Sequence, residues 1–109
     1  MPSQLDIFFS PKSVAVIGAS RTPGKMGYMI LENLKTTFLG KIYPINPNTN
    51  EMFGMASFPS VLGIEEPIDL AIIALKAEAV PTILEECIKK KIKGAIIVSS
   101  GFAEAGNVY

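Results

Sequence analysis

The sequence predicts an α/β domain in three layers, with a mostly parallel β-sheet and helices on both faces. Three short apolar runs carry this prediction, at 14–19, 70–75 and 95–98. Each run is continuously apolar instead of alternating, which is typical of parallel strands that are covered on both sides. Apolar residues at helical spacing lie between the runs. The 109 residues, 49% of them hydrophobic, suffice for the core of one domain.

The N-terminal part of the chain predicts a short helix, a strand and a longer helix. Residues 5–11 are too apolar for a free tail, so we expect a short turn of helix with Phe8 and Phe9 in the core. The first strand follows at 14–19. The longer helix is indicated by apolar residues at helical spacing, Met26, Ile30, Leu34 and Phe38. Gly40 suits a left-handed stop just after its last turn.

The middle of the chain predicts a second strand, a structured loop and a third strand. The second strand is expected at 41–47. Glycines and prolines among apolar residues make 49–67 a structured loop, with one short strand near 56–58. The third strand is the run at 70–75, and the fourth is the run at 95–98.

A second helix lies between the third and fourth strands. Its apolar stripe consists of Val80, Ile83, Leu84, Cys87 and Ile88. Pro81 is tolerated in the first turn, and the lysines at 89–91 suit the negative end of the helix dipole. Cys87 is predicted to be an inert buried thiol, and a lone cysteine forms no internal disulfide. Glu85 and Glu86 lie on the polar face, where we expect them to pair with the lysines four residues later.

The loop after the first strand is the strongest functional signal. Gly18, Gly24 and Gly27 lie between an apolar strand and a helix, where backbone N–H groups can hold a phosphate. A purely structural turn is the alternative. The dinucleotide fingerprint G-x-G-x-x-G is not matched, because Ser20 replaces its second glycine and four extra residues widen the turn. Asn46 also replaces the carboxylate that would bind a ribose, which disfavours NAD.

Composition excludes several function classes. Ten basic residues balance ten acidic ones, so no broad positive field favours nucleic acid or an anionic membrane. Neither a signal peptide nor a membrane span is recognisable, so a cytoplasmic location is expected. Histidine is absent, which removes the commonest acid–base group, the commonest metal ligand and any phosphohistidine. We therefore predict no catalytic residue and no metal site in this chain.

Taken together and in order, five segments resemble a known family. They are Phe-Ser-Pro-Lys-Ser-Val-Ala-Val-Ile-Gly-Ala-Ser at 9–20, Gly-Lys-Met-Gly at 24–27, Tyr-Pro-Ile-Asn-Pro at 43–47, Asp-Leu-Ala-Ile-Ile-Ala-Leu at 69–75 and Ser-Ser-Gly-Phe-Ala-Glu at 99–104. The chain resembles the N-terminal CoA-binding domain of the NDP-forming acyl-CoA synthetases, the ADP-forming acetate–CoA ligase group. More distantly it is similar to the α-subunit of succinyl-CoA synthetase. The resemblance covers nearly the whole chain and implies a Rossmann-like domain that holds CoA at the carboxyl ends of its strands.

The resemblance implies a set of CoA-binding residues. Those expected to face the phosphates are Gly18, Ala19, Ser20, Arg21, Gly24 and Lys25. Those expected along the nucleotide and pantetheine path are Asn46, Pro47, Leu75 and Lys76, while Ser99, Ser100 and Gly101 would close the site near the thiol. The alternatives are loop solubility for Arg21 and Lys25, an Asx-type turn for Asn46, and a loop cap for Ser20. Family members often have Val-Pro where this chain has Leu75 and Lys76, and a lysine there could add a phosphate partner.

The resemblance also divides the chemistry among domains. In the family, the phosphorylated histidine and the site for ATP or ADP and Mg belong to further domains or subunits of an oligomeric synthetase. This chain would bind CoA and position its thiol, and in isolation it is expected to be inactive. Residues 101–106 suggest the turn into another helix, so 1–109 is expected to be one domain from the N-terminal part of a longer chain. Two alternatives remain: a stand-alone or regulatory CoA-binding module, for example of an acetyltransferase, and an NAD(P)-binding oxidoreductase domain.

Overall fold

The computed structural model describes residues 6–98, and Ser99, Ser100 and Gly101 lie outside this part of the chain. The elements in chain order are α1 Asp6–Phe9, β1 Ser13–Ile17, α2 Met26–Thr37, β2 Lys41–Ile45, β3 Glu51–Met52, β4 Met55–Ala56, β5 Leu70–Ile73, α3 Val80–Lys90 and β6 Gly94–Ile97. Two short 3-10 turns complete them, η1 at Val61–Gly63 and η2 at Ala77–Ala79. The strands and helices predicted within residues 6–98 all form, with ends that shift by a few residues, and the turn into a helix expected at 101–106 lies outside the described residues.

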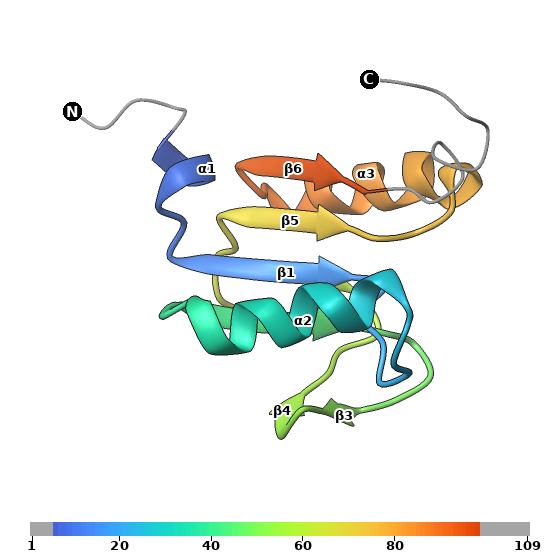
Figure 1. The fold of residues 1–109 in the computed structure, drawn as a ribbon. Helices are drawn as coiled ribbons and strands as arrows, with labels where there is room; N and C mark the ends of the chain where they lie inside the picture. Colours follow the sequence, from blue (N-terminus) through green and yellow to red (C-terminus); the bar gives the residue numbers. More distant parts are fainter. Residues whose placement is uncertain (1–5, 99–109) are drawn as a thin grey trace, which may run out of the picture.

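The main sheet has the strand order β2-β1-β5-β6, and all its strand pairs are parallel. Helix α2 lies over β1 and β2 on one face, and α3 lies behind β5 and β6 on the other (Figure 1). The three-layer α/β prediction is therefore confirmed. The chain leaves β1 toward β2 on one side and later enters β5 on the other side of β1. The strand order thus reverses between β1 and β5, where open α/β sheets usually bind ligands.

Two apolar clusters form the core, one on each face of the sheet. Alternate residues of β1 divide between them, because successive side chains of a strand point to opposite faces. Val14 and Val16 pack with Leu31 of α2, while Ala15 and Ile17 pack with residues of β5 and α3. These four β1 side chains are all buried, as the continuous apolar run predicts.

Among the described residues, no helix combines the length and the apolarity that crossing a bilayer requires.

Several predictions about apolar residues are wrong. Phe8 and Phe9 are 41% and 81% exposed, because α1 is one short turn at the margin of the fold. Ile88 is 73% exposed. Eight residues after Val80, it is rotated by about 80° from that side chain around the helix, at the margin of the buried stripe. Ile96 and Ile97 are also partly exposed, since β6 is an edge strand of the described sheet.

Predictions about the ends of the helices also change. Gly40 does not have the left-handed conformation; α2 ends at Thr37, and Phe38 is already extended. A Cβ on Gly40 would lie 2.4 Å from the Lys12 carbonyl oxygen, so close packing is what requires glycine there. The left-handed residue is Lys91, which ends α3 with φ 66°. The short strand expected near 56–58 is β4, and Phe58 adds a parallel bridge to Ile45.

The side chains of α3 have different partners from those expected. Glu86 accepts a hydrogen bond from Ser60, and Lys90 donates to the Ile64 carbonyl. Within residues 6–98 the ion pair is Lys93 with Asp69, so the expected glutamate–lysine pairs along α3 are not formed. The predicted burial of Cys87 is confirmed, and this burial raises the pKa of its thiol above the ordinary value. The thiol therefore stays protonated and unreactive near neutral pH.

Asp69 joins the starts of β1 and β5. Its carboxylate accepts a hydrogen bond from the Lys12 backbone N–H at 2.8 Å and lies 3.3 Å from the Lys93 ammonium. The Lys12 hydrogen bond, and after it Lys93, hold the pKa of the Asp69 carboxyl below its usual range, although partial burial opposes them. A pKa lower in the folded than in the unfolded chain makes ionised Asp69 stabilising. This contribution is lost as the pH falls through the folded-state pKa.

We expect Asp69→Asn to lower the free energy of unfolding at pH 7 by about 1 kcal/mol or less, because the ion partner Lys93 is largely exposed. The variant should lose less stability than the wild type between pH 7 and about pH 2.5, below the usual aspartate pKa of about 3.9. Urea denaturation at both pH values measures this, with Glu65→Gln in an exposed loop as the control. Equal acid sensitivity of Asp69→Asn and the wild type would contradict the role of Asp69.

Candidate functional site

The candidate site begins where β1 ends. Gly18 has φ +93°, and the backbone N–H groups of Gly18 and Ala19 both donate to the Ile45 carbonyl at the end of β2. On the other side, Ala74 N–H donates to the Ile17 carbonyl at 2.7 Å. The loop is thus held against the ends of both strands that flank β1. A Cβ on Gly27 would lie 1.9 Å from the Gly18 carbonyl oxygen, so the start of α2 packs directly on this loop.

The rest of the loop forms tight turns. Ser20 Oγ accepts a hydrogen bond from Thr22 N–H at 3.0 Å, and Thr22 in turn accepts one from Lys25 N–H at 3.2 Å. Gly24, with φ +93°, lies between them in open space. Lys25 is the N-cap residue of α2, and its side chain does not cap the helix. Tyr28 N–H donates to the Lys25 carbonyl, so the N–H groups of Met26 and Gly27 are the ones that the first turn of α2 presents, as at anion sites on helix N-termini.

Two pockets meet at this loop. We name them by the helix that contributes to each. The α3 pocket, about 430 Å³, is lined by Ile17, Gly18, Ala19, Ser20, Ile45, Asn46, Pro47, Asn48, Pro59, Leu75, Ile83 and Glu86. The α2 pocket, about 250 Å³, is lined by Gly18, Ser20, Lys25, Met26, Gly27, Ala74, Leu75, Lys76 and Val98. They share Gly18, Ser20 and Leu75, so together they form one crevice at the carboxyl ends of β1, β2 and β5.

The Asn46 side chain joins two segments that line the crevice. Its Nδ2 donates to the Ala19 carbonyl at 2.8 Å, and its Oδ1 accepts from Asn48 N–H at 2.7 Å. The second bond is the Asx-type turn that the sequence offered as an alternative. The side chain therefore ties the end of β2 to the glycine loop while it lines the α3 pocket. Replacing it with a shorter side chain would loosen both segments.

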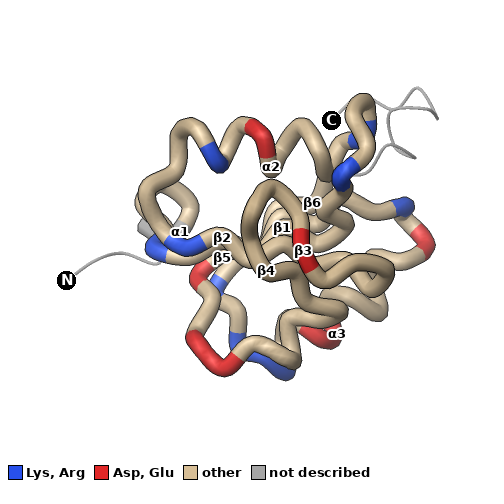
Figure 2. Tube along the Cα trace, turned by 90° about the horizontal axis from the view of Figure 1, so that it is seen from below, with Lys and Arg blue, Asp and Glu red and all other residues tan. Residues whose placement is uncertain are grey.

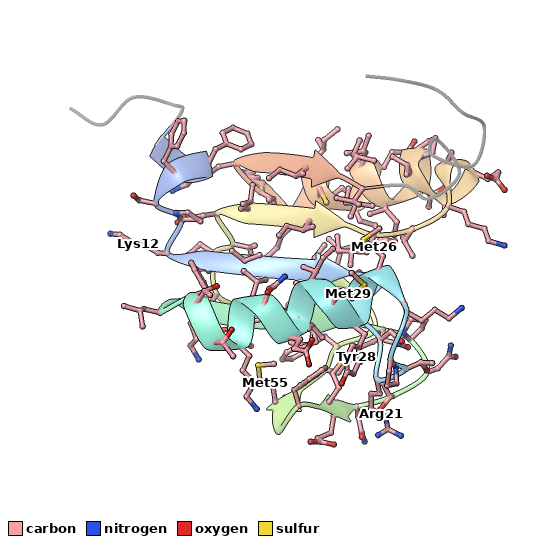
Figure 3. The ribbon with its side chains drawn as sticks, in the orientation of Figure 1. Lys12, Arg21, Met26, Tyr28, Met29 and Met55 are labelled. Carbon is pink, nitrogen blue, oxygen red and sulfur yellow. The ribbon has the colours of Figure 1, made fainter. Side chains whose placement is uncertain are left out.

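The structure brings together most of the predicted site residues that it describes. Those that line one or both pockets are Gly18, Ala19, Ser20, Lys25, Asn46, Pro47, Leu75 and Lys76. Arg21 and Gly24 line neither pocket. The Arg21 guanidinium points toward β3 (Figure 3), where it lies 3.5 Å from the Glu51 carbonyl oxygen. The nearby hairpin also packs on α2 through Phe53 and Tyr28, whose ring centroids are 5.1 Å apart.

Sequence reasoning missed Pro59, Ile83 and Glu86 in the α3 pocket. Ile83 was assigned to the core and Glu86 to a solvated helix face, although residues three apart share one side of a helix. Pro59 follows Phe58, which bridges to Ile45 at the end of β2. The strand expected near 56–58 is the only sequence signal that could have pointed to it.

Few charged side chains line the crevice, and their sign differs between its two pockets. Basic and acidic residues are interspersed along the chain in the view from below (Figure 2). In the α2 pocket two lysines, Lys25 and Lys76, come from loops that follow different strands. In the α3 pocket Glu86 supplies the charge. The α2 pocket thus suits an anion, and the α3 pocket suits a neutral group that can donate hydrogen bonds.

Comparison with known proteins gives a consistent result. A family model described as a CoA binding domain matches residues 12–107. An ADP-forming acetate–CoA ligase of Methanocaldococcus jannaschii is 58% identical over 97 residues, which are 89% of this chain and 14% of that protein. Subunit alpha of the ADP-forming acetate–CoA ligase II of Pyrococcus furiosus is 44% identical over 94% of this chain and 22% of that subunit.

A solved structure shares the fold. The dinucleotide-forming acetyl-coenzyme A synthetase 1 of Ca. Korarchaeum cryptofilum, in complex with phosphate and ADP, superposes with a TM-score of 0.87 at 39% identity. The match covers 94% of this chain and 22% of that one. The chain thus spans less than a quarter of the length of each of these relatives.

Proposed function

The chain belongs to the CoA-binding domain family, and from this membership we propose that its crevice binds coenzyme A as part of an ADP-forming acyl-CoA synthetase. The observation that carries the proposal is the pair of pockets joined at Gly18, Ser20 and Leu75. CoA is a long ligand with a purine at one end, phosphates in the middle and a thiol-bearing arm at the other. The mostly apolar α3 pocket, the glycine loop and the α2 pocket with its two lysines follow one another in the order of those groups.

The diphosphate would lie at the glycine loop. The uncapped first turn of α2 supplies N–H groups and the positive end of the helix dipole. Lys25 and Lys76 line the α2 pocket beside this loop and would neutralise the charge of the phosphates. The adenosine would enter the α3 pocket, whose walls include Pro47, Pro59 and Ile83. The pantetheine arm would then run along the α2 pocket toward Val98.

The synthetase assignment rests on the relatives. The relatives named above are acetate–CoA ligases and an acetyl-CoA synthetase, and the P. furiosus relative is an α subunit. The present chain contains no histidine, so a phosphohistidine would have to come from another domain or subunit. We propose that this domain binds CoA and presents its thiol to an acyl group formed by those partners. The partners would also bind ATP or ADP and Mg.

Binding of CoA rather than NAD tests this proposal. Strand β2 ends at Ile45, and the next residue is Asn46, whose amide is neutral and already bonded to Ala19 and Asn48. The end of β2 therefore lacks the carboxylate that binds the two ribose hydroxyls in dinucleotide-binding domains. We expect CoA to bind at least about tenfold more tightly than NAD, a difference of about 1.4 kcal/mol. Isothermal titration of the chain with both ligands measures it. Equal or tighter binding of NAD would refute the CoA assignment.

A further inference from the structure

Glu86 is the one charged side chain among the described residues that line the α3 pocket. It lies on α3, three residues after Ile83, and both side chains reach the same pocket. The other lining residues are apolar, small or neutral, among them Pro47 and Pro59. A half-buried carboxylate in such surroundings favours any ligand group that donates a hydrogen bond to it.

A hydroxyl from a different element orients this carboxylate. Ser60 Oγ donates to Glu86 Oε1 at 2.7 Å. The same Oγ accepts a hydrogen bond from Leu62 N–H at 3.1 Å, as the N-cap of η1. Because the carboxylate oxygen accepts, the proton of Ser60 is directed to Glu86, while the hydroxyl oxygen accepts from Leu62. The carboxylate is therefore held in one orientation, with acceptor positions left for a ligand.

The charge of Glu86 restricts which part of CoA it can meet. A carboxylate repels phosphate, so the diphosphate and the phosphate on the ribose 3′ oxygen are both disfavoured beside it. The ribose hydroxyl is adjacent to that 3′ phosphate. The exocyclic amine of adenine is a neutral donor at the far end of the purine from the ribose. Among the donors of the adenosine part, it is thus the one that can approach Glu86 while the phosphates stay at the lysines of the α2 pocket. The amide and hydroxyl donors of the pantetheine arm would lie along the α2 pocket toward Val98, away from Glu86.

We propose that Glu86 accepts a hydrogen bond from the exocyclic amine of adenine and so makes the site specific for an adenine-bearing ligand. This assignment rests on the CoA-binding function proposed above. The purine lies between the apolar walls formed by Pro47, Pro59 and Ile83. Ser60 is a positioning residue that acts through Glu86. A purine with a carbonyl oxygen in place of the amine would set two acceptors against each other and would be rejected.

The experiment compares CoA with its hypoxanthine analogue, which has the same fused ring, carries that carbonyl oxygen in place of the amine and bears a proton on the neighbouring N1. A lost hydrogen bond to a charged group leads us to expect a preference of roughly tenfold or more for CoA in the wild-type chain. Glu86→Gln is isosteric and can still accept from Ser60, so the fold should be retained. Its amide N–H can donate to the carbonyl oxygen, and the preference should fall to within roughly threefold. Both affinities are measured by calorimetry, and thermal melting verifies folding.

Glu85→Gln is the matched control, since Glu85 is the exposed neighbour on the same helix and should leave the preference at the wild-type value. A wild-type chain that binds CoA without preference for its base overturns the assignment. So does a Glu86→Gln variant that keeps the full preference, or one that loses affinity for both ligands equally, as a contact with the ribose would require. A wild-type chain that binds neither ligand instead overturns the CoA-binding proposal itself.

Discussion

Replacing Gly18 with alanine is expected to destabilise the fold by about 3 kcal/mol and to abolish CoA binding. A Cβ at this position would lie 2.2 Å from the Ala74 carbonyl oxygen and 2.9 Å from its carbon, which belong to the backbone at the end of β5. The residue also has φ +93°, which alanine adopts only with strain. Gly18 and Ala19 are bonded to Ile45, and the preceding Ile17 is bonded to Ala74, so the loop cannot move away without breaking these bonds.

Urea denaturation of Gly18→Ala measures this loss of stability. Gly63→Ala is the control, since a Cβ on Gly63 would meet nothing within 4 Å and Gly63 is not among the positive-φ residues. That variant should stay within about 0.5 kcal/mol of the wild type. A Gly18→Ala protein with wild-type stability would show that β1 and β5 can separate at their carboxyl ends, and the geometry of the crevice would need revision.

Replacing Gly24 with valine is expected to lower CoA affinity at least about tenfold while the melting temperature changes little. A β-branched residue at φ +93° costs about 1–3 kcal/mol, and the exposed loop can relieve that cost by changing its turn. Such a change would displace Lys25 and the first turn of α2, which line the α2 pocket. Residues 20–25 lie outside the two core clusters, so the fold should survive.

Calorimetric titration with CoA, together with thermal melting, distinguishes the possible outcomes for Gly24→Val. The control is Gly63→Val, which also places a side chain in open space but without a positive φ, and which should bind CoA as the wild type does. Normal CoA binding by Gly24→Val would make Gly24 a turn residue without influence on the site. An unfolded variant would mean that the loop supports the core, contrary to its open surroundings.

The strands and the two long helices were predictable because their signals are local. Continuous apolar runs gave β1 and β5, and apolar residues at helical spacing gave α2 and α3. Burial at the margins was not predictable in the same way. Phe9 and Ile88 are apolar residues that the described fold leaves mostly uncovered, and no local pattern distinguishes them from buried ones. Gly40 likewise owes its identity to a contact with Lys12, which is distant in the sequence.

The candidate site was likewise predictable only in part. The glycine loop was visible in the sequence, since a strand, a turn and a helix follow one another along the chain. The partners of individual side chains were not. Arg21 lies within the loop but reaches toward β3. Glu86 lies on a helix face that appeared solvated, but it contacts Ser60 and lines the α3 pocket. These contacts join residues that are 30 and 26 positions apart.

The sequence by itself determined the parallel α/β architecture, the family resemblance and the place of the phosphate-type loop, because each depends on residues that are neighbours in the chain. Only the tertiary structure decided that Asn46 ties this loop to β2, that Gly18 must lack a Cβ, and that Glu86 enters the pocket. The physical reason is the reversal of strand order between β1 and β5. It brings the ends of three strands and the side of α3 into one crevice, and distances across that crevice depend on packing that no local pattern encodes.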